Sequence, residues 1–135
     1  MKYKFLEHKA DAKFQAFGKT LEETFSNAAL AMTSVMTDYE KIKPNVTYKI
    51  EAEGSDKKAL LYNFLEQLLI LLDTESFLLH KVKSIKINKN KLEAEFIGDK
   101  FSKNNYVIKI NIKAVTYNDM EVKEKPFMVQ VVVDI

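Results

Sequence analysis

Cysteine and arginine are both missing from the 135 residues of this chain. Without cysteine there can be no disulfides, thiol nucleophiles or thiolate zinc sites. Since arginine is absent, the 21 basic residues are all lysines. Arginine is the preferred bidentate reader of guanine edges and phosphates, so we do not expect sequence-specific recognition of nucleic acid by this chain alone.

Glycine, histidine and long apolar runs are scarce as well. The three glycines, Gly18, Gly54 and Gly98, stand too far apart for a dinucleotide fingerprint or a Walker loop. Only His8 and His80 could supply imidazole. No apolar run reaches membrane-spanning length, and the first residues lack the apolar stretch of a signal peptide. We therefore expect a cytoplasmic chain without membrane association.

The composition that remains is that of an ordinary soluble globular protein. The chain has a mass of 15.6 kDa, with 47% hydrophobic and 30% charged residues, which predicts one domain spanning 1–135. Its net charge of +2 is too close to zero for a protein that wraps nucleic acid electrostatically.

Two helices are predicted from apolar residues that recur every three to four positions. Thr20 and Glu23 form a capping box, so the first helix should start there and end before Pro44. The second carries an apolar stripe from Leu60 to Leu72 and is apolar almost all round its second half. That pattern indicates either deep burial or an exposed patch that meets a partner.

Most of the rest alternates between apolar and polar residues, as half-buried strands do. The predicted strands are 3–8, 12–17, 46–53, 82–88, 91–97, 106–116, 120–123 and 126–134. No strand-helix-strand unit repeats, and tight turns join neighbouring strands. The expected fold class is therefore α+β, with two helices packed on a mostly antiparallel β-sheet.

Few polar groups could form a site. His8 and Asp11 flank a predicted turn, and either side chain could cap that turn through a hydrogen bond. For Asp11 the alternative is a metal ligand. Asp134 stands beside the terminal carboxylate on Ile135, and such close negative charges need a cation or amide donors to offset them. If the first and last strands lie near each other, Asp11, Asp134 and the end of Ile135 would converge. Oxygen clusters of this kind suit calcium, magnesium or manganese.

A second polar cluster covers 113–119. It is either a hairpin turn supplied by Asn118 and Asp119 or a functional group of side chains at a strand end.

Several segments resemble the archease family, whose members assist RtcB-type RNA ligases in tRNA splicing and RNA repair. No single segment is diagnostic, but together and in this order they are specific. They are FLEHKAD at 5–11, GKTLEETF at 18–25 with NAA at 27–29, VMTD at 35–38, FLEQLL at 64–69 with LDTE at 72–75, KAVTY at 113–117 and VDI at 133–135.

The resemblance implies an archease-like fold and a divalent-metal site built from Asp11, Asp134 and Ile135, with His8 as a neighbour. Calcium is the first expectation, and manganese or magnesium are the alternatives. The implied role is an activator, not an enzyme, that promotes guanylylation and turnover of the ligase and meets tRNA indirectly. The matching segment at 113–117 makes Lys113, Thr116 and Tyr117 candidate partner contacts.

Two other roles stay open at this stage. One is a chaperone for a tRNA-modifying enzyme such as a tRNA methyltransferase. The other is a small metal-dependent hydrolase, although no base or nucleophile accompanies the ligands. The chain also departs from the family pattern at Asn118, where histidine is usual, and at Ala12, where glycine is usual.

Overall fold

The computed structural model describes residues 1–6 and 11–135. In these ranges the chain forms strands and helices in the order β1 (Tyr3–Leu6), β2 (Asp11–Phe17), α1 (Leu21–Met36), a short 3-10 turn (Tyr39–Lys41), β3 (Val46–Glu53), α2 (Lys57–Glu75), β4 (Phe77–Asn88), β5 (Lys91–Lys100), β6 (Ala114–Glu124) and β7 (Phe127–Asp134).

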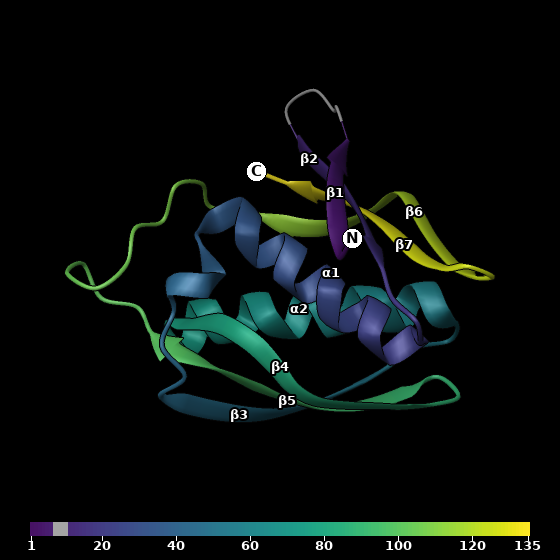
Figure 1. The fold of residues 1–135 in the computed structure, drawn as a ribbon, viewed down its shortest axis with the longest axis horizontal. Coiled ribbons are helices and arrows are strands. Elements are labelled where there is room, and N and C mark those ends of the chain that lie inside the picture. The colour runs from purple at the N-terminus through teal and green to yellow at the C-terminus, as the bar shows by residue number, and fades with distance from the viewer. Residues whose placement is uncertain (7–10) are drawn as a thin grey trace.

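The elements stack in three layers, with the helices in the middle (Figure 1). One sheet, which we call the terminal sheet, has the strand order β1-β2-β7-β6, and the other, the hairpin sheet, has the order β3-β5-β4. Every strand pair is antiparallel. Both helices contact strands of both sheets. The predicted α+β class with two helices on antiparallel sheet is thus confirmed, with the sheet divided in two.

Local sequence signals explain where the helices begin. Thr20 Oγ1 accepts a hydrogen bond from the Glu23 N–H at 3.1 Å, and the Glu23 carboxylate accepts one from the Lys19 N–H at 3.2 Å. The predicted cap is confirmed, although its return bond reaches one residue further back than in the usual box. In α2, Asp56 caps the Ala59 N–H at 2.8 Å.

The two helices share one aromatic core with the hairpin sheet. The Phe25 ring of α1 lies 5.9 Å from that of Phe64 in α2, which lies 5.6 Å from that of Phe96 in β5. All three side chains are fully buried. Deep burial therefore describes one stripe of α2, whereas Ile70 in its second half is 42% exposed. Among the described residues, neither helix combines the length and apolar character needed to cross a membrane.

Two strand predictions near the end of the chain are wrong. The predicted strand 106–116 is mostly a connection, because residues 101–113 form no strand and β6 begins only at Ala114. The segment 120–123 belongs to this same β6. The chain must cross from the hairpin sheet to the terminal sheet here, so its alternating residues have no neighbouring strand with which to form a ladder.

The hairpin turn predicted at Asn118 and Asp119 is wrong too. Both residues lie inside β6, where the pairing with β7 shifts between Thr116 and Glu121. Asp119 adopts a left-handed φ of 51° within this bulge, a conformation that aspartate tolerates better than most residues. The reversal instead falls between β6 and β7, after Glu124.

Candidate functional site

The second strand, β2, and the last strand, β7, are hydrogen-bonded neighbours in the middle of the terminal sheet. In the register of β2 with β7, Asp11 lies directly opposite Asp134. On the other side of β7, Ala114 of β6 also faces Asp134, and the Lys113 N–H donates to the Asp134 carbonyl at 2.7 Å. The start of β2 and the end of β7 therefore meet at the same end of the terminal sheet, which is the proximity that an oxygen cluster of Asp11 and Asp134 needs.

Asp11 and Asp134 lie on the outer face of this sheet. Phe14 and Ala16 of β2 are fully buried toward the helices, and side chains alternate along a strand. Asp11, Lys13 and Gln15 therefore share the opposite face. Since directly opposed side chains on a sheet have Cβ atoms about 5 Å apart, the two carboxylates belong to one local charge cluster.

A polar network that sequence reasoning missed adjoins the two aspartates. Lys13 Nζ lies 3.4 Å from a carboxylate oxygen of Asp119, and the Lys13 side chain is only 18% exposed. Gln130 donates to the Asp119 carbonyl at 2.8 Å and accepts from Gln15 at 2.9 Å. The β6 bulge thus brings Asp119 over the outer face, where it holds the ammonium group of Lys13.

The donor chemistry around Asp11 and Asp134 fits a hard divalent cation. Both side chains are half-buried, and carboxylate oxygens are the ligands that calcium, magnesium and manganese prefer. Within residues 1–6 and 11–135, no three histidine, aspartate or glutamate side chains gather as a metal site. Within that set, Asp11 and Asp134 thus provide two side chains with carboxylate oxygens and no third. Ile135 packs partly against the core, which fixes the residue that follows Asp134.

Of the other predicted site residues, His8 lies outside the described residues. Lys113 immediately precedes β6 and adjoins Asp134 through the backbone bond given above. The Thr116 hydroxyl donates to the Val132 carbonyl at 2.8 Å, so this hydroxyl bonds to the neighbouring strand β7 of the same chain. Tyr117 is 54% exposed and stacks on Tyr62 of α2, with ring centroids 4.3 Å apart. Their contact with a partner stays a prediction.

The Tyr62 and Tyr117 stack also has an acidic neighbour. Burial raises the pKa of the Tyr62 hydroxyl, and the nearby Glu66 carboxylate raises it further. The tyrosine consequently keeps its proton and can serve as a hydrogen-bond donor well above neutral pH.

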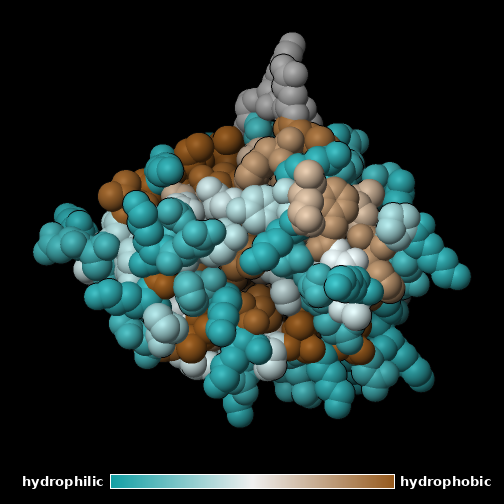
Figure 2. Space-filling model, viewed as in Figure 1, coloured by the Kyte–Doolittle hydropathy of each residue, from teal (hydrophilic) through white to brown (hydrophobic). Residues whose placement is uncertain are grey.

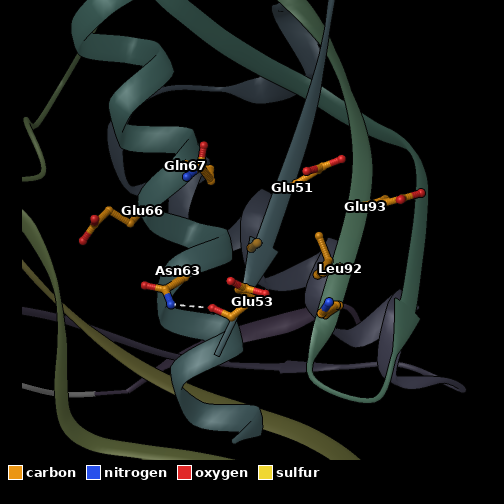
Figure 3. Close-up of a pocket in the computed structure, with 9 residues that line it drawn as sticks. Glu51, Glu53, Asn63, Glu66, Gln67, Leu92 and Glu93 are labelled. Carbon is orange, nitrogen blue, oxygen red and sulfur yellow. Dashed lines mark hydrogen bonds between the residues drawn. The ribbon is translucent and has the colours of Figure 1, made fainter. Parts of the chain in front are cut away.

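A separate acidic groove of about 560 Å³ lies between α2 and the hairpin sheet. Glu51, Glu53 and Glu93 line it from the strands, while Asn63 and Gln67 line it from α2 (Figure 3). Asn63 donates to the Glu53 carbonyl at 2.7 Å and so ties the helix to the sheet. This groove shares no lining residue with the Asp11 and Asp134 cluster.

The model of the archease protein family matches residues 3–135. The chain belongs to the archease family. It is 38% identical over 137 residues to a protein named archease from Sulfolobus acidocaldarius, and the match covers 99% of both chains. It is 41% identical over 135 residues to another from Pyrococcus furiosus, with 96% of this chain and 95% of the relative covered.

The fold agrees with this assignment. The solution structure of protein 1598 from Methanobacterium thermoautotrophicum superposes with a TM-score of 0.82 at 29% identity, and 99% of each chain is covered. The family resemblance seen in the sequence segments is therefore confirmed, and the predicted archease-like fold with it.

Proposed function

We propose that this archease-family chain is an accessory protein in tRNA processing, rather than an enzyme, and that it activates an RtcB-type RNA ligase. In this role it promotes guanylylation and turnover of the ligase during tRNA splicing and RNA repair. Family membership supports the accessory role, and the placement of the two aspartates supports the means by which the chain acts.

The observation that carries the proposal is the pairing of Asp11 with Asp134 in neighbouring strands. Two carboxylates held opposite each other form half of a hard-cation site. The terminal carboxylate of Ile135 is the proposed third ligand, and His8 a proposed neighbour. A bound divalent ion would supply positive charge that offsets the negative charge of a nucleotide triphosphate in the ligase.

The chain's own residues fix the geometry of this site. Pairing of β2 with β7 and of β6 with β7 holds Asp134 between two strands. Little conformational entropy would therefore be lost at this residue when a cation binds. Lys113 immediately precedes β6, and Thr116 and Tyr117 lie near the start of that strand. These three residues are the proposed partner contacts.

Guanylylation of a purified RtcB-type ligase tests the proposal. With Asp11→Ala or Asp134→Ala, stimulation should fall to the level of the ligase alone. Asp73→Ala is a matched control, because Asp73 is an exposed carboxylate near the end of α2, and it should leave stimulation unchanged. Full stimulation by the folded Asp11 and Asp134 variants would contradict the proposal.

The terminal ligand has its own test. Residues added after Ile135 should weaken calcium or manganese binding, because the carboxylate is moved away from Asp134. Equal affinity in the extended chain would exclude the terminal carboxylate as a ligand. A chaperone for a tRNA methyltransferase, the second role considered, instead requires that aggregation of that enzyme be suppressed equally by wild type and by Asp11→Ala.

A further inference from the structure

The connection between β5 and β6 has the sequence of a strand but not its hydrogen bonds. Residues 107–112 read VIKINI, which combines alternation with β-branched side chains of high strand propensity. In the structure this segment lies outside both sheets. We call residues 107–112 the unpaired strip.

Three contacts hold the strip and its end in place. The Lys109 N–H donates to the Met36 carbonyl at 2.8 Å, at the last turn of α1. The Thr37 hydroxyl donates to the Val107 carbonyl at 2.7 Å. Just beyond the strip, the Lys113 N–H is bonded to Asp134. By contrast, the N–H groups of Ile110 and Ile112 have no acceptor within the described part of the chain.

The strip also leaves apolar side chains in water. Val107 is 74% exposed and Ile110 is 43% exposed. Hydrophobic atoms gather along the upper left of Figure 2, where Figure 1 draws the connection running toward β6. Together these two β-branched side chains offer apolar area on one anchored segment, and its burial by another protein would be favourable.

The charge beside the strip is positive. A groove of about 340 Å³ borders the start of the strip at Val107 and Lys109, and its lining also includes Lys41 and Lys103. Asp38 is the one carboxylate in that lining, so the three lysines leave a net positive charge there. A partner segment that carries carboxylates would complement this surface, while a basic one would be repelled.

We propose that the unpaired strip is a docking site for an extended, acidic segment of a partner protein, which adds to it as a strand. The partner's main chain would bond the free N–H groups of Ile110 and Ile112. Its apolar side chains would cover Val107 and Ile110, and its carboxylates would face Lys103 and Lys109. Strand addition uses main-chain bonds for affinity and side-chain pockets for specificity.

This inference rests on the proposed function for the partner's identity, which is the RtcB-type ligase. The position of the strip agrees with it, since the strip leads through Lys113 directly to Asp134. A ligase docked on the strip would therefore lie beside the proposed metal site.

Affinity for the purified ligase tests the strip with exposed-residue variants. Val107→Ser and Ile110→Ser should each weaken binding about tenfold, because each removes an apolar contact. Lys109→Glu should slow association most at low salt. Ile70→Ser is the matched control, since Ile70 is 42% exposed on α2, and it should keep wild-type affinity.

Hydrogen exchange gives a second, independent readout. The amides of Ile110 and Ile112 should become protected when the ligase is added, while those of exposed α2 residues should not change. If wild type binds the ligase, but the two amides gain no protection and the strip variants bind as tightly as wild type, docking on the strip is excluded while the proposed function stands. No binding by wild type would overturn the proposed function together with the strip. Protection produced by tRNA without ligase would identify a nucleic-acid surface instead and also overturn the proposal.

Discussion

Replacing Asp134 with asparagine should stabilise the metal-free protein while abolishing its response to metal. Asp134 and Asp11 lie opposite each other on neighbouring strands, and like charges in directly opposed positions destabilise a sheet. Asparagine keeps the shape of the side chain but removes one of the two charges. The variant therefore separates the electrostatic cost of the pair from its proposed use.

The size of the effect follows from the spacing. Carboxylates about 5 Å apart repel by roughly 1 kcal/mol in water and about 3 kcal/mol at an effective dielectric constant near 20. Measured cross-strand pairs contribute roughly 0.2–1 kcal/mol. The ammonium group of Lys13, which lies on the same face, is held by Asp119. We therefore expect Asp134→Asn to raise the free energy of unfolding by about 1 kcal/mol at low salt.

Metal binding should reverse the order of the two proteins, because it should stabilise wild type but not the variant. A ligand at 100 times its Kd stabilises the folded state by about 2.7 kcal/mol. For a chain of 135 residues, 1 kcal/mol shifts the Tm by roughly 3–4 °C. Wild type should then gain about 10 °C with saturating calcium or manganese, and the variant should gain almost nothing.

Thermal unfolding followed by circular dichroism, with and without metal, measures both effects. The two proteins should exchange order, with the variant more stable without metal and wild type more stable with it. Asp73→Asn serves as the control and should behave as wild type under both conditions. An Asp134→Asn protein whose Tm rises with metal as much as that of wild type would refute the reasoning, and so would one that is less stable without metal.

Four further predictions concern other parts of the structure. Gly98→Ala should destabilise the fold by more than about 2 kcal/mol, because an added Cβ would lie 1.9 Å from the Leu78 carbonyl oxygen; a denaturation midpoint equal to that of wild type would contradict this packing. Thr20→Ala should cost about 1 kcal/mol in urea unfolding through the lost α1 cap, whereas Thr20→Ser should restore most of it. Asp119→Ala frees Lys13 to approach Asp11 and should weaken calcium or manganese binding, as measured by calorimetry. Adding Lys13→Met to this variant should restore the affinity. Unchanged affinity in both proteins would show that Asp119 and Lys13 do not influence metal binding. Burial, with a hydrogen bond to Tyr3, raises the pKa of Tyr39 to about 12. Because the folded state then holds this proton above pH 10 and the unfolded state does not, stability should fall between pH 10 and about 12, less steeply in Tyr39→Phe, and identical pH profiles would exclude this cause.

Local signals in the sequence were sufficient for much of the fold. The capping residue Thr20 and the alternation around Phe14 are properties of a few neighbouring positions, and both predictions agree with the structure. The meeting of Asp11 with Asp134 was conditional on the first and last strands being neighbours. That condition depends on long-range pairing, which no short window of sequence contains.

The misread segments failed for the same reason. Ile108, Ile110 and Ile112 alternate as well as any residues in β7, but a strand forms only where a neighbour offers a ladder. The Lys13 and Asp119 pair joins residues 106 positions apart, and it depends on a bulge in β6. Lys13 stands two residues after Asp11, a spacing that puts both side chains on one face of a strand, but the predicted strand began at Ala12 and left Asp11 in the turn.

The edge strands β4 and β6, one in each sheet, differ in how readily they could accept a partner strand. On the hairpin sheet, the edge strand β4 exposes Lys81, Lys83 and Lys86, and lysines on an edge discourage pairing with other chains. The terminal sheet ends in β6, which the unpaired strip precedes with exposed Val107 and Ile110. A partner strand that pairs along the strip and continues onto β6 would meet apolar contacts first and Asp134 next. Of the edges β4 and β6, β6 is therefore better suited to accept a strand. Since β6 lies beside the proposed metal site, a single docking event would bring that site to the ligase.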